Sequence, residues 1–182
     1  LRCLVGSEMC IRDRSSSAAL ETATALLIEA LSGKSLSVKE RALLCQKAEH
    51  EWVGVPCGIM DQLSVGAGIE DHVLRIDCQS LEVEALSLPA GVQLVVADTG
   101  VKHALADGEY GKRRDDCEAA LKVLGATCWR EVTFELVHEM RDQLGDRRFR
   151  RARHAVTEMQ RVVDFAAALK SGHSDELGLL MR

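Results

Sequence analysis

A run of three serines is the first place where residue type and position together point to chemistry. Ser15, Ser16 and Ser17 precede an Ala-Ala-Leu-Glu segment, a pattern typical of a helix start. The unpaired amides and the dipole of a helix N-terminus attract anions, so a phosphate group could bind there. A serine run is more often a simple helix cap, and both interpretations stay open on these residues alone.

An acid after a glycine-rich turn is the main candidate for catalysis. Asp61 stands three residues after Gly58, at the expected start of a short helix. A carboxylate placed there can accept the proton of a hydroxyl nucleophile, which is general-base chemistry. The alternative is that Asp61 only caps its helix, a common use of aspartate.

Glu49, at the expected end of the preceding helix, is a candidate metal ligand. A carboxylate and a serine hydroxyl suit Mg²⁺, which takes one or two protein oxygens together with phosphate and water. A solvated acid at a helix end is the competing interpretation. Further along, the polar loop with His103 and Tyr110 follows an apolar run, and loops at strand ends often carry ligand contacts. Either of these two residues alone is more often structural.

The elements that must position these residues are a mixture of helices and short strands. Apolar spacing and capping residues predict helices over residues 15–33, 37–49, 112–124, 134–144, 149–170 and 175–182, and a short one from residue 60. Strands are predicted over residues 73–77, 83–86 and 93–97. Because helices and strands do not alternate strictly, the predicted fold class is α+β.

Composition and charge exclude several classes of binding partner. The 182 residues are 47% hydrophobic and 28% charged, and the net charge of −5 argues against nucleic acid or an anionic membrane surface as partner. No apolar run approaches the ~20 residues that span a bilayer. The seven cysteines include no Cys-x-x-Cys pair, so a zinc site is not expected and a reduced cytoplasm is the simplest location.

Residues 1–14 differ in character from the rest of the chain and show no hydrophobic period. The codons ATG TGT ATA AGA GAC AG would encode Met9 to Asp13 and the start of Arg14, and they match a transposase adapter used in sequencing libraries. An upstream continuation of that adapter would encode Leu4 to Glu8. We interpret residues 1–14 as adapter read-through and expect them to take no part in the fold.

From Ser15 to Arg182 the chain resembles the GHMP small-molecule kinases and, among them, the galactokinases. The segments that carry the resemblance are Ser15 to Glu21, Ala48 to His50, Gly54 to Gln62, Asp77 to Glu82, Val101 to His103, Glu109 to Arg114 and Phe149 to His154. The resemblance implies a two-layer α+β GHMP-kinase-like fold, truncated at both ends. Residues 15–182 would be the end of its N-terminal domain and the start of its C-terminal domain.

The resemblance also implies a reaction, the transfer of phosphate from ATP to the anomeric hydroxyl of galactose. Asp61 would be the catalytic base, and Gly58 and Tyr110 would contact the sugar. The proton acceptor orients the nucleophile, while positioning and charge neutralisation supply most of the rate. The implied product is galactose 1-phosphate.

On the nucleotide side, the resemblance assigns Ser15, Ser16 and Ser17 to the phosphates and Ser17 and Glu49 to Mg²⁺. Arg14 stands where the family has leucine, and the glycines before the serines are missing. The family's N-terminal sugar-binding motif and its C-terminal glycine-rich motif are absent too. The chain is therefore expected to hold the base and the metal ligands but not a whole active site.

Three other functions stay open. A related sugar kinase would act on N-acetylgalactosamine, arabinose or galacturonate, although the Gly-Ile-Met-Asp-Gln motif favours galactose. A galactokinase-like sugar sensor would bind ligands without catalysis, and the intact serine motif speaks against it. A purely structural helical domain would leave the segment Gly58 to Gln62 unexplained.

Overall fold

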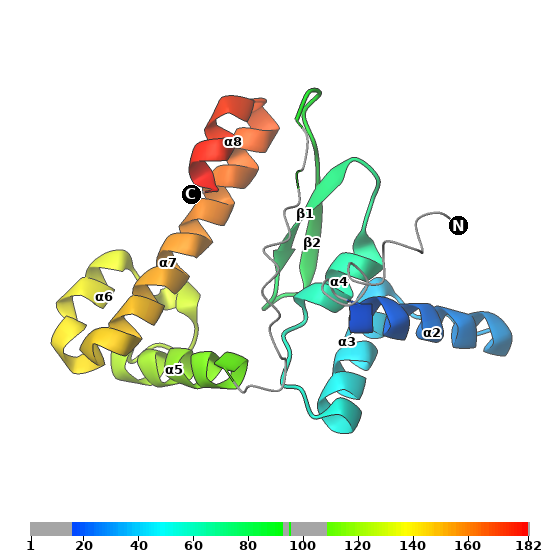
Figure 1. The fold of residues 1–182 in the computed structure, drawn as a ribbon, viewed down its shortest axis with the longest axis horizontal. Coiled ribbons are helices and arrows are strands. Elements are labelled where there is room, and N and C mark those ends of the chain that lie inside the picture. The colour runs from blue at the N-terminus through cyan, green and yellow to red at the C-terminus, as the bar shows by residue number, and fades with distance from the viewer. Residues whose placement is uncertain (1–15, 93–94, 96–108, 182) are drawn as a thin grey trace. The chain divides into compact units, whose positions relative to one another are not determined.

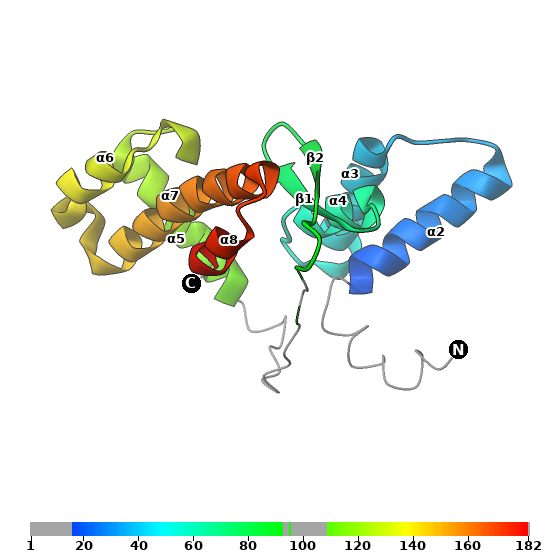
Figure 2. The same cartoon turned by 90° about the horizontal axis from the view of Figure 1, so that it is seen from above.

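The chain folds into two compact units, residues 1–88 and residues 89–182, each with its own hydrophobic core. The computed structural model describes residues 16–92, 95 and 109–181. Figures 1 and 2 show the elements of each unit in two views. The first unit contains α2 (Ser16–Ser32), α3 (Val38–Ala48), the π-helix η1 (Glu49–Val53), α4 (Met60–Ala67), β1 (His72–Asp77) and β2 (Glu82–Ser87).

Local capping and one ion pair fix α2 and α3 to each other. Gly33 takes the left-handed conformation that ends α2, and Ser37 opens α3. The Ser37 hydroxyl accepts from the Glu40 amide while the Glu40 carboxylate accepts from the Ser37 amide, which satisfies two amides at this helix end. The Arg41 guanidinium donates to the Glu29 carboxylate at 2.7 Å, so α3 is tied to α2.

The two strands form one antiparallel hairpin in which Val73 lies opposite Leu86. Its turn is closed by the Asp77 carboxylate, which accepts from the amides of Gln79 and Ser80 at 2.9 and 3.0 Å. An aspartate that binds the amides following it in this way stabilises a tight turn. The hairpin is thereby held in a defined register beside the helices.

The core of the first unit joins α3, α4 and the hairpin. Leu63 of α4 is completely buried and packs with Ala42 of α3 and with Ile59, just before α4. Three partly buried side chains from the hairpin complete this cluster, namely Ile76, Leu81 and Val83. Burial of this leucine therefore sets the position of α4, the helix that carries Asp61.

The second unit is helical, with α5 (Glu109–Leu124), the 3₁₀ helix η3 (Trp129–Glu131), α6 (Phe134–Glu139), α7 (Arg141–Ser171) and α8 (Ser174–Leu180). Its core is formed by Ala120, Leu124, Val132, Val137, Leu144, Phe149 and Ala152. Asp116 on α5 is buried and forms an ion pair with Arg147 of α7, which lowers the pKa of Asp116. The two long helices of this unit are thus joined by charge as well as by apolar packing.

The predicted α+β class is confirmed, since helices combine with an antiparallel hairpin. The helix predicted over 134–144 was too long, because α6 ends at Glu139 and α7 begins at Arg141. Gly145 interrupts α7 with a positive φ of 68°, which a residue without a Cβ adopts at low cost.

The predicted strand 93–97 and residues 1–14 lie almost wholly outside the described residues. No helix in the described ranges is long and apolar enough to cross a membrane.

Candidate functional site

The first turn of α2 carries the part of the serine run that the structure describes. Ser17 is exposed, whereas Ala18 and Thr22, on the adjacent side of the helix, are 1% and 5% exposed. Glu21 follows Ser17 by four residues, so the two side chains lie on one side of the helix about one turn apart. Ser15 and the side chain of Ser16 lie outside the described part of the chain.

Glu49 begins the π-helix that follows α3, and its side chain is buried, with only 5% exposure for the residue. The interpretation of Glu49 as a solvated helix-end acid was therefore wrong. Gly54 ends the π-helix in a left-handed conformation with φ 74°, and its amide donates to the Glu49 carbonyl. Single π-turns are rare and are frequently found at functional sites.

Asp61 lies in the first turn of α4 and is half-buried. The N-cap of this helix is Ile59, so Asp61 does not have the N-cap role that the alternative interpretation gave it. An acid in the first turn still benefits from the positive end of the helix dipole. Gly58, the predicted sugar contact, is exposed directly before this turn.

The loop that leads into α4 is held by two side chains from the preceding helices. The Cys57 carbonyl accepts from Gln46 Nε2 at 3.3 Å and lies 2.9 Å from His50 Nε2. These contacts anchor the residue immediately before Gly58. The start of α4, and with it Asp61, is therefore positioned from both ends, by this loop and by the buried Leu63.

A cluster of polar side chains joins the three segments. The Glu21 carboxyl lies close enough to the Glu49 carboxyl and to the Gln62 amide for both to affect its pKa. Burial and, after it, the neighbouring Glu49 carboxyl raise the pKa of Glu21 from 4.5 to about 7, while Gln62 acts in the opposite direction. Sequence reasoning missed Glu21 and Gln62 as parts of the site, although the spacing of four residues from Ser17 was a usable signal.

The donor set of this cluster fits a hard cation. Within the described residues no cationic side chain pairs with Glu49, and two buried oxygens, Glu21 Oε2 and Gln62 Oε1, have no hydrogen-bond donor. Carboxylate and amide oxygens without a positive partner are the surroundings in which Mg²⁺ binds well. No group of three or more His, Cys, Asp or Glu side chains in the described part of the chain could hold a metal, so this cluster could offer Mg²⁺ only the one or two protein oxygens that the ion takes beside phosphate.

The structure describes the side chains of some predicted site residues and not of others. Glu21, one turn beyond Ser17, lies close enough to Glu49 and to Gln62, the residue next to Asp61, for both to affect its pKa. The convergence of Ser17, Glu49 and Asp61 on one pocket stays a prediction. The side chain of Tyr110 lies outside the described part of the chain.

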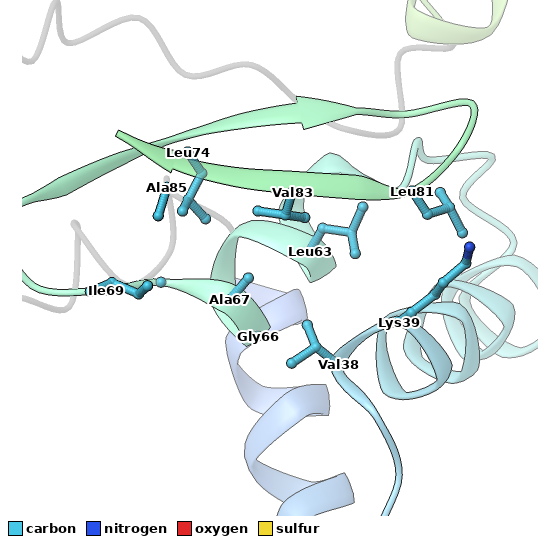
Figure 3. Close-up of a pocket in the computed structure, with 11 residues that line it drawn as sticks. Val38, Lys39, Leu63, Gly66, Ala67, Ile69, Leu74, Leu81, Val83 and Ala85 are labelled. Carbon is cyan, nitrogen blue, oxygen red and sulfur yellow. The ribbon is translucent and has the colours of Figure 1, made fainter. Parts of the chain in front are cut away.

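A separate groove of about 560 Å³ lies between α4 and the hairpin. Figure 3 shows Leu63 and Ala67 of α4 facing Leu74 and Val83 of the hairpin across it, with Lys39 at one end. Residues two apart on a helix point in nearly opposite directions, so the groove lies on the side of α4 away from Asp61. Apart from Lys39, whose ammonium donates to the Ser80 carbonyl, its lining is apolar, and the groove is not the candidate site.

Comparison with known proteins finds similarity to small-molecule kinases. Residues 14–68 match the family described as GHMP kinases N terminal domain. The chain is 43% identical over 168 residues to the galactokinase of Bos taurus, 43% identical over 170 residues to that of Mannheimia succiniciproducens, and 42% identical over 168 residues to that of Homo sapiens. Each alignment covers 92% of this chain.

A solved structure shows the same fold. The chain is similar to the galactokinase of Lactococcus lactis crystallised in complex with galactose, with a TM-score of 0.79 and 28% sequence identity over 90% of this chain. The chain spans only 43–44% of the length of the curated relatives named above and 44% of this structure.

Proposed function

We propose, from the premise that the chain is a galactokinase homologue with part of a GHMP kinase domain, that it is the central part of an ATP-dependent galactose 1-kinase. One observation carries the proposal. Glu21, one turn beyond Ser17 on α2, lies close enough to the buried Glu49 and to Gln62 of α4 for both to affect its pKa, and the motif Gly-Ile-Met-Asp-Gln puts an acid next to Gln62. An acid beside an anion-attracting helix end and a cation-compatible carboxylate is suited to phosphoryl transfer.

In this proposal Asp61 takes the proton from the anomeric hydroxyl of galactose. The sugar O1 then forms a bond to the γ-phosphorus of ATP, the bond between that phosphorus and the β,γ-bridging oxygen breaks, and ADP leaves. The proton ends on the Asp61 carboxylate and the electron pair on ADP. Gly58 and Tyr110 contact the sugar.

The nucleotide is bound on the other side of the cluster. Ser15, Ser16 and Ser17 line its phosphates at the start of α2, where amides and helix dipole favour negative charge. Ser17 and Glu49 hold Mg²⁺. The ion, when bound, neutralises the charge of the phosphates and of the leaving group.

The same proposal names the binding partners of the protein and its location in the cell. Galactose and ATP are its partners, with no nucleic acid and no membrane. The described cysteines are all reduced, namely Cys45, Cys57, Cys78, Cys117 and Cys128, and a cytoplasmic location supplies both ATP and a reducing environment.

The test is a coupled assay of ADP release by the full-length protein that carries this segment. The sugars are galactose, N-acetylgalactosamine, arabinose and galacturonate, each with ATP and Mg²⁺, and the phosphorylated carbon is identified by ³¹P and ¹H NMR. We expect the highest kcat/KM for galactose, with phosphate on C1. A higher kcat/KM for another of the four sugars would replace galactose as substrate, and galactose binding without turnover would identify a sensor.

A further inference from the structure

We propose that His50 and Gln46 are positioning residues that orient the backbone amide of Gly58 for the sugar. The proposal rests on the function proposed above and extends it to two side chains outside the predicted site. Both side chains hydrogen-bond to the Cys57 carbonyl, the group that directly precedes the Gly58 amide in the chain. Neither side chain touches the sugar itself in this account.

The Cys57 carbonyl receives donors from two consecutive helices. Gln46 lies on α3 and His50 on the π-helix η1, and their Nε2 atoms are 3.3 and 2.9 Å from the carbonyl oxygen. The two residues are four positions apart, so their side chains leave the same side of the chain about one turn apart. Because a carbonyl oxygen only accepts, the shorter contact requires that the His50 ring carries a proton on Nε2.

The other side of Cys57 is held by backbone hydrogen bonds. The Cys57 amide donates to the Val55 carbonyl at 2.8 Å, which closes a three-residue turn centred on Pro56. Proline keeps its φ near the value that such a turn needs. The Val55 amide in turn donates to the Glu49 carbonyl at 3.2 Å, so the turn is attached to the π-helix. With its amide and its carbonyl both bonded, Cys57 passes a defined orientation to the next peptide unit.

The direction of the Gly58 amide follows from the planarity of that peptide unit. The peptide units of the described residues are trans, and in a trans unit the N–H points opposite to the preceding carbonyl. Since the Cys57 carbonyl points toward α3 and η1, the Gly58 N–H points away from both. Gly58 is exposed, and within the described ranges its amide has no hydrogen-bond acceptor. A glycine can hydrogen-bond a sugar hydroxyl only through its backbone, and this amide is directed outward for that purpose.

Stability alone does not explain two side-chain donors on one carbonyl. A carbonyl in a loop near the surface can accept from water, so a protein donor adds little net free energy of folding. Two donors from different positions do restrict the orientation of the peptide unit, because one hydrogen bond alone leaves it free to turn about that bond. An amide that is already oriented costs less to order when the ligand binds.

The experiment uses variants of the full-length protein. His50→Asn has an amide that reaches only as far as Nδ1 and loses the contact, whereas the amide of His50→Gln reaches about as far as Nε2 and can keep it. Gln46→Met keeps the length of the side chain without a donor. Glu51→Gln, which changes an exposed carboxylate on the same π-helix, is the control.

Calorimetry measures the Kd of galactose, of the galactose analogues that each lack one hydroxyl, and of a non-hydrolysable ATP analogue with Mg²⁺. We expect His50→Asn and Gln46→Met each to raise the Kd of galactose about 3- to 10-fold, within the value of one net hydrogen bond. His50→Gln and Glu51→Gln should stay within about twofold of the unmodified protein, and so should nucleotide binding in every variant. For the analogue that lacks the hydroxyl bound by Gly58 the loss should disappear, because effects on one shared contact are not additive.

Two results with the sugars would overturn the inference. A loss in His50→Asn that is equal for galactose and for every analogue would show that the side chain supports the loop without orienting a sugar contact. A Kd of galactose that is the same in His50→Asn and His50→Gln would show that the Nε2 hydrogen bond does not matter. If His50→Asn fails to fold in melting experiments, Gln46→Met gives the same comparison across the analogues.

Failure of the proposed function gives a different result, because the unmodified protein would then bind no galactose or bind it without turnover. Amide exchange without sugar still tests the positioning in that case. The hydrogen-bonded amides of Val55 and Cys57 should exchange about 3- to 10-fold faster in His50→Asn than in His50→Gln. Equal exchange in these two variants would overturn the role given to His50.

Discussion

Truncating Leu63 to alanine tests how the fold holds the helix that bears the candidate base. Leu63 lies on α4, has no exposed surface, and packs against α3 and the hairpin. Removing three carbons from a buried leucine costs about 2–5 kcal/mol, depending on how much of the emptied space stays void. Leu63 also lines the groove of about 560 Å³, so part of the emptied volume would join a space that water can reach. We therefore expect the lower part of the range, about 2–3 kcal/mol.

Amide hydrogen exchange in the full-length protein measures this loss where it occurs. A loss of 2–3 kcal/mol corresponds to exchange that is roughly 30- to 150-fold faster at the protected amides of β1, β2 and α4. Val65→Ala is the matched control, because Val65 lies on the same helix but is 37% exposed, and it should accelerate exchange by less than about threefold. Equal effects of the two substitutions would refute the assignment of Leu63 to the core that fixes α4.

Three further predictions follow from other contacts. Arg41 lowers the pKa of Glu29 from 4.5 to about 2, so the ion pair contributes fully to stability above pH 4.5 and is lost as the pH falls through about 2. The difference in unfolding free energy between the unmodified protein and Glu29→Gln should therefore shrink as the pH falls from 4.5 to about 2. A difference that grows over this pH range would contradict the ion pair between Glu29 and Arg41. Ser37→Ala should lower the free energy of unfolding by about 1 kcal/mol in urea titrations, the usual value of an N-cap, and no change would mean that the capping box adds nothing. The 182-residue chain alone should show no galactose-dependent ADP release, because catalytic groups that act together are lost together. It should also self-associate in sedimentation experiments, because Leu20, Leu31 and Trp52 are 71%, 80% and 87% exposed. A monomeric, active chain would contradict both expectations.

Local signals made most of the first unit predictable. The Ser37 and Glu40 pair fixed the start of α3, and the Asp77 turn between two β-type runs fixed the hairpin, because both depend on residues a few positions apart. The predicted gap over residues 145–148 contains one non-helical residue, Gly145, and the break between Glu139 and Arg141 was not predicted. Neighbouring helices supply the packing that lets the chain resume its helix after one residue.

The parts that were not predictable depend on contacts between distant residues. Nothing near Glu49 signals a π-helix, since its extra residue per turn is stabilised by how the turn packs. Glu49 and Gln62, which both affect the pKa of Glu21, lie 28 and 41 residues away from it in the sequence, and no spacing rule connects such positions. The motifs identified which residues could react, and only the fold showed which side chains surround them.

The most direct test of the account is the phosphoryl-transfer step in an Asp61→Asn variant of the full-length protein. Single-turnover measurements with galactose, ATP and Mg²⁺ isolate this step from product release. Asparagine has nearly the same shape but cannot accept the proton, so the rate should fall about 10²- to 10⁴-fold, with the Kd values of galactose and nucleotide nearly unchanged. A single-turnover rate close to that of the unmodified protein would remove Asp61 from the mechanism.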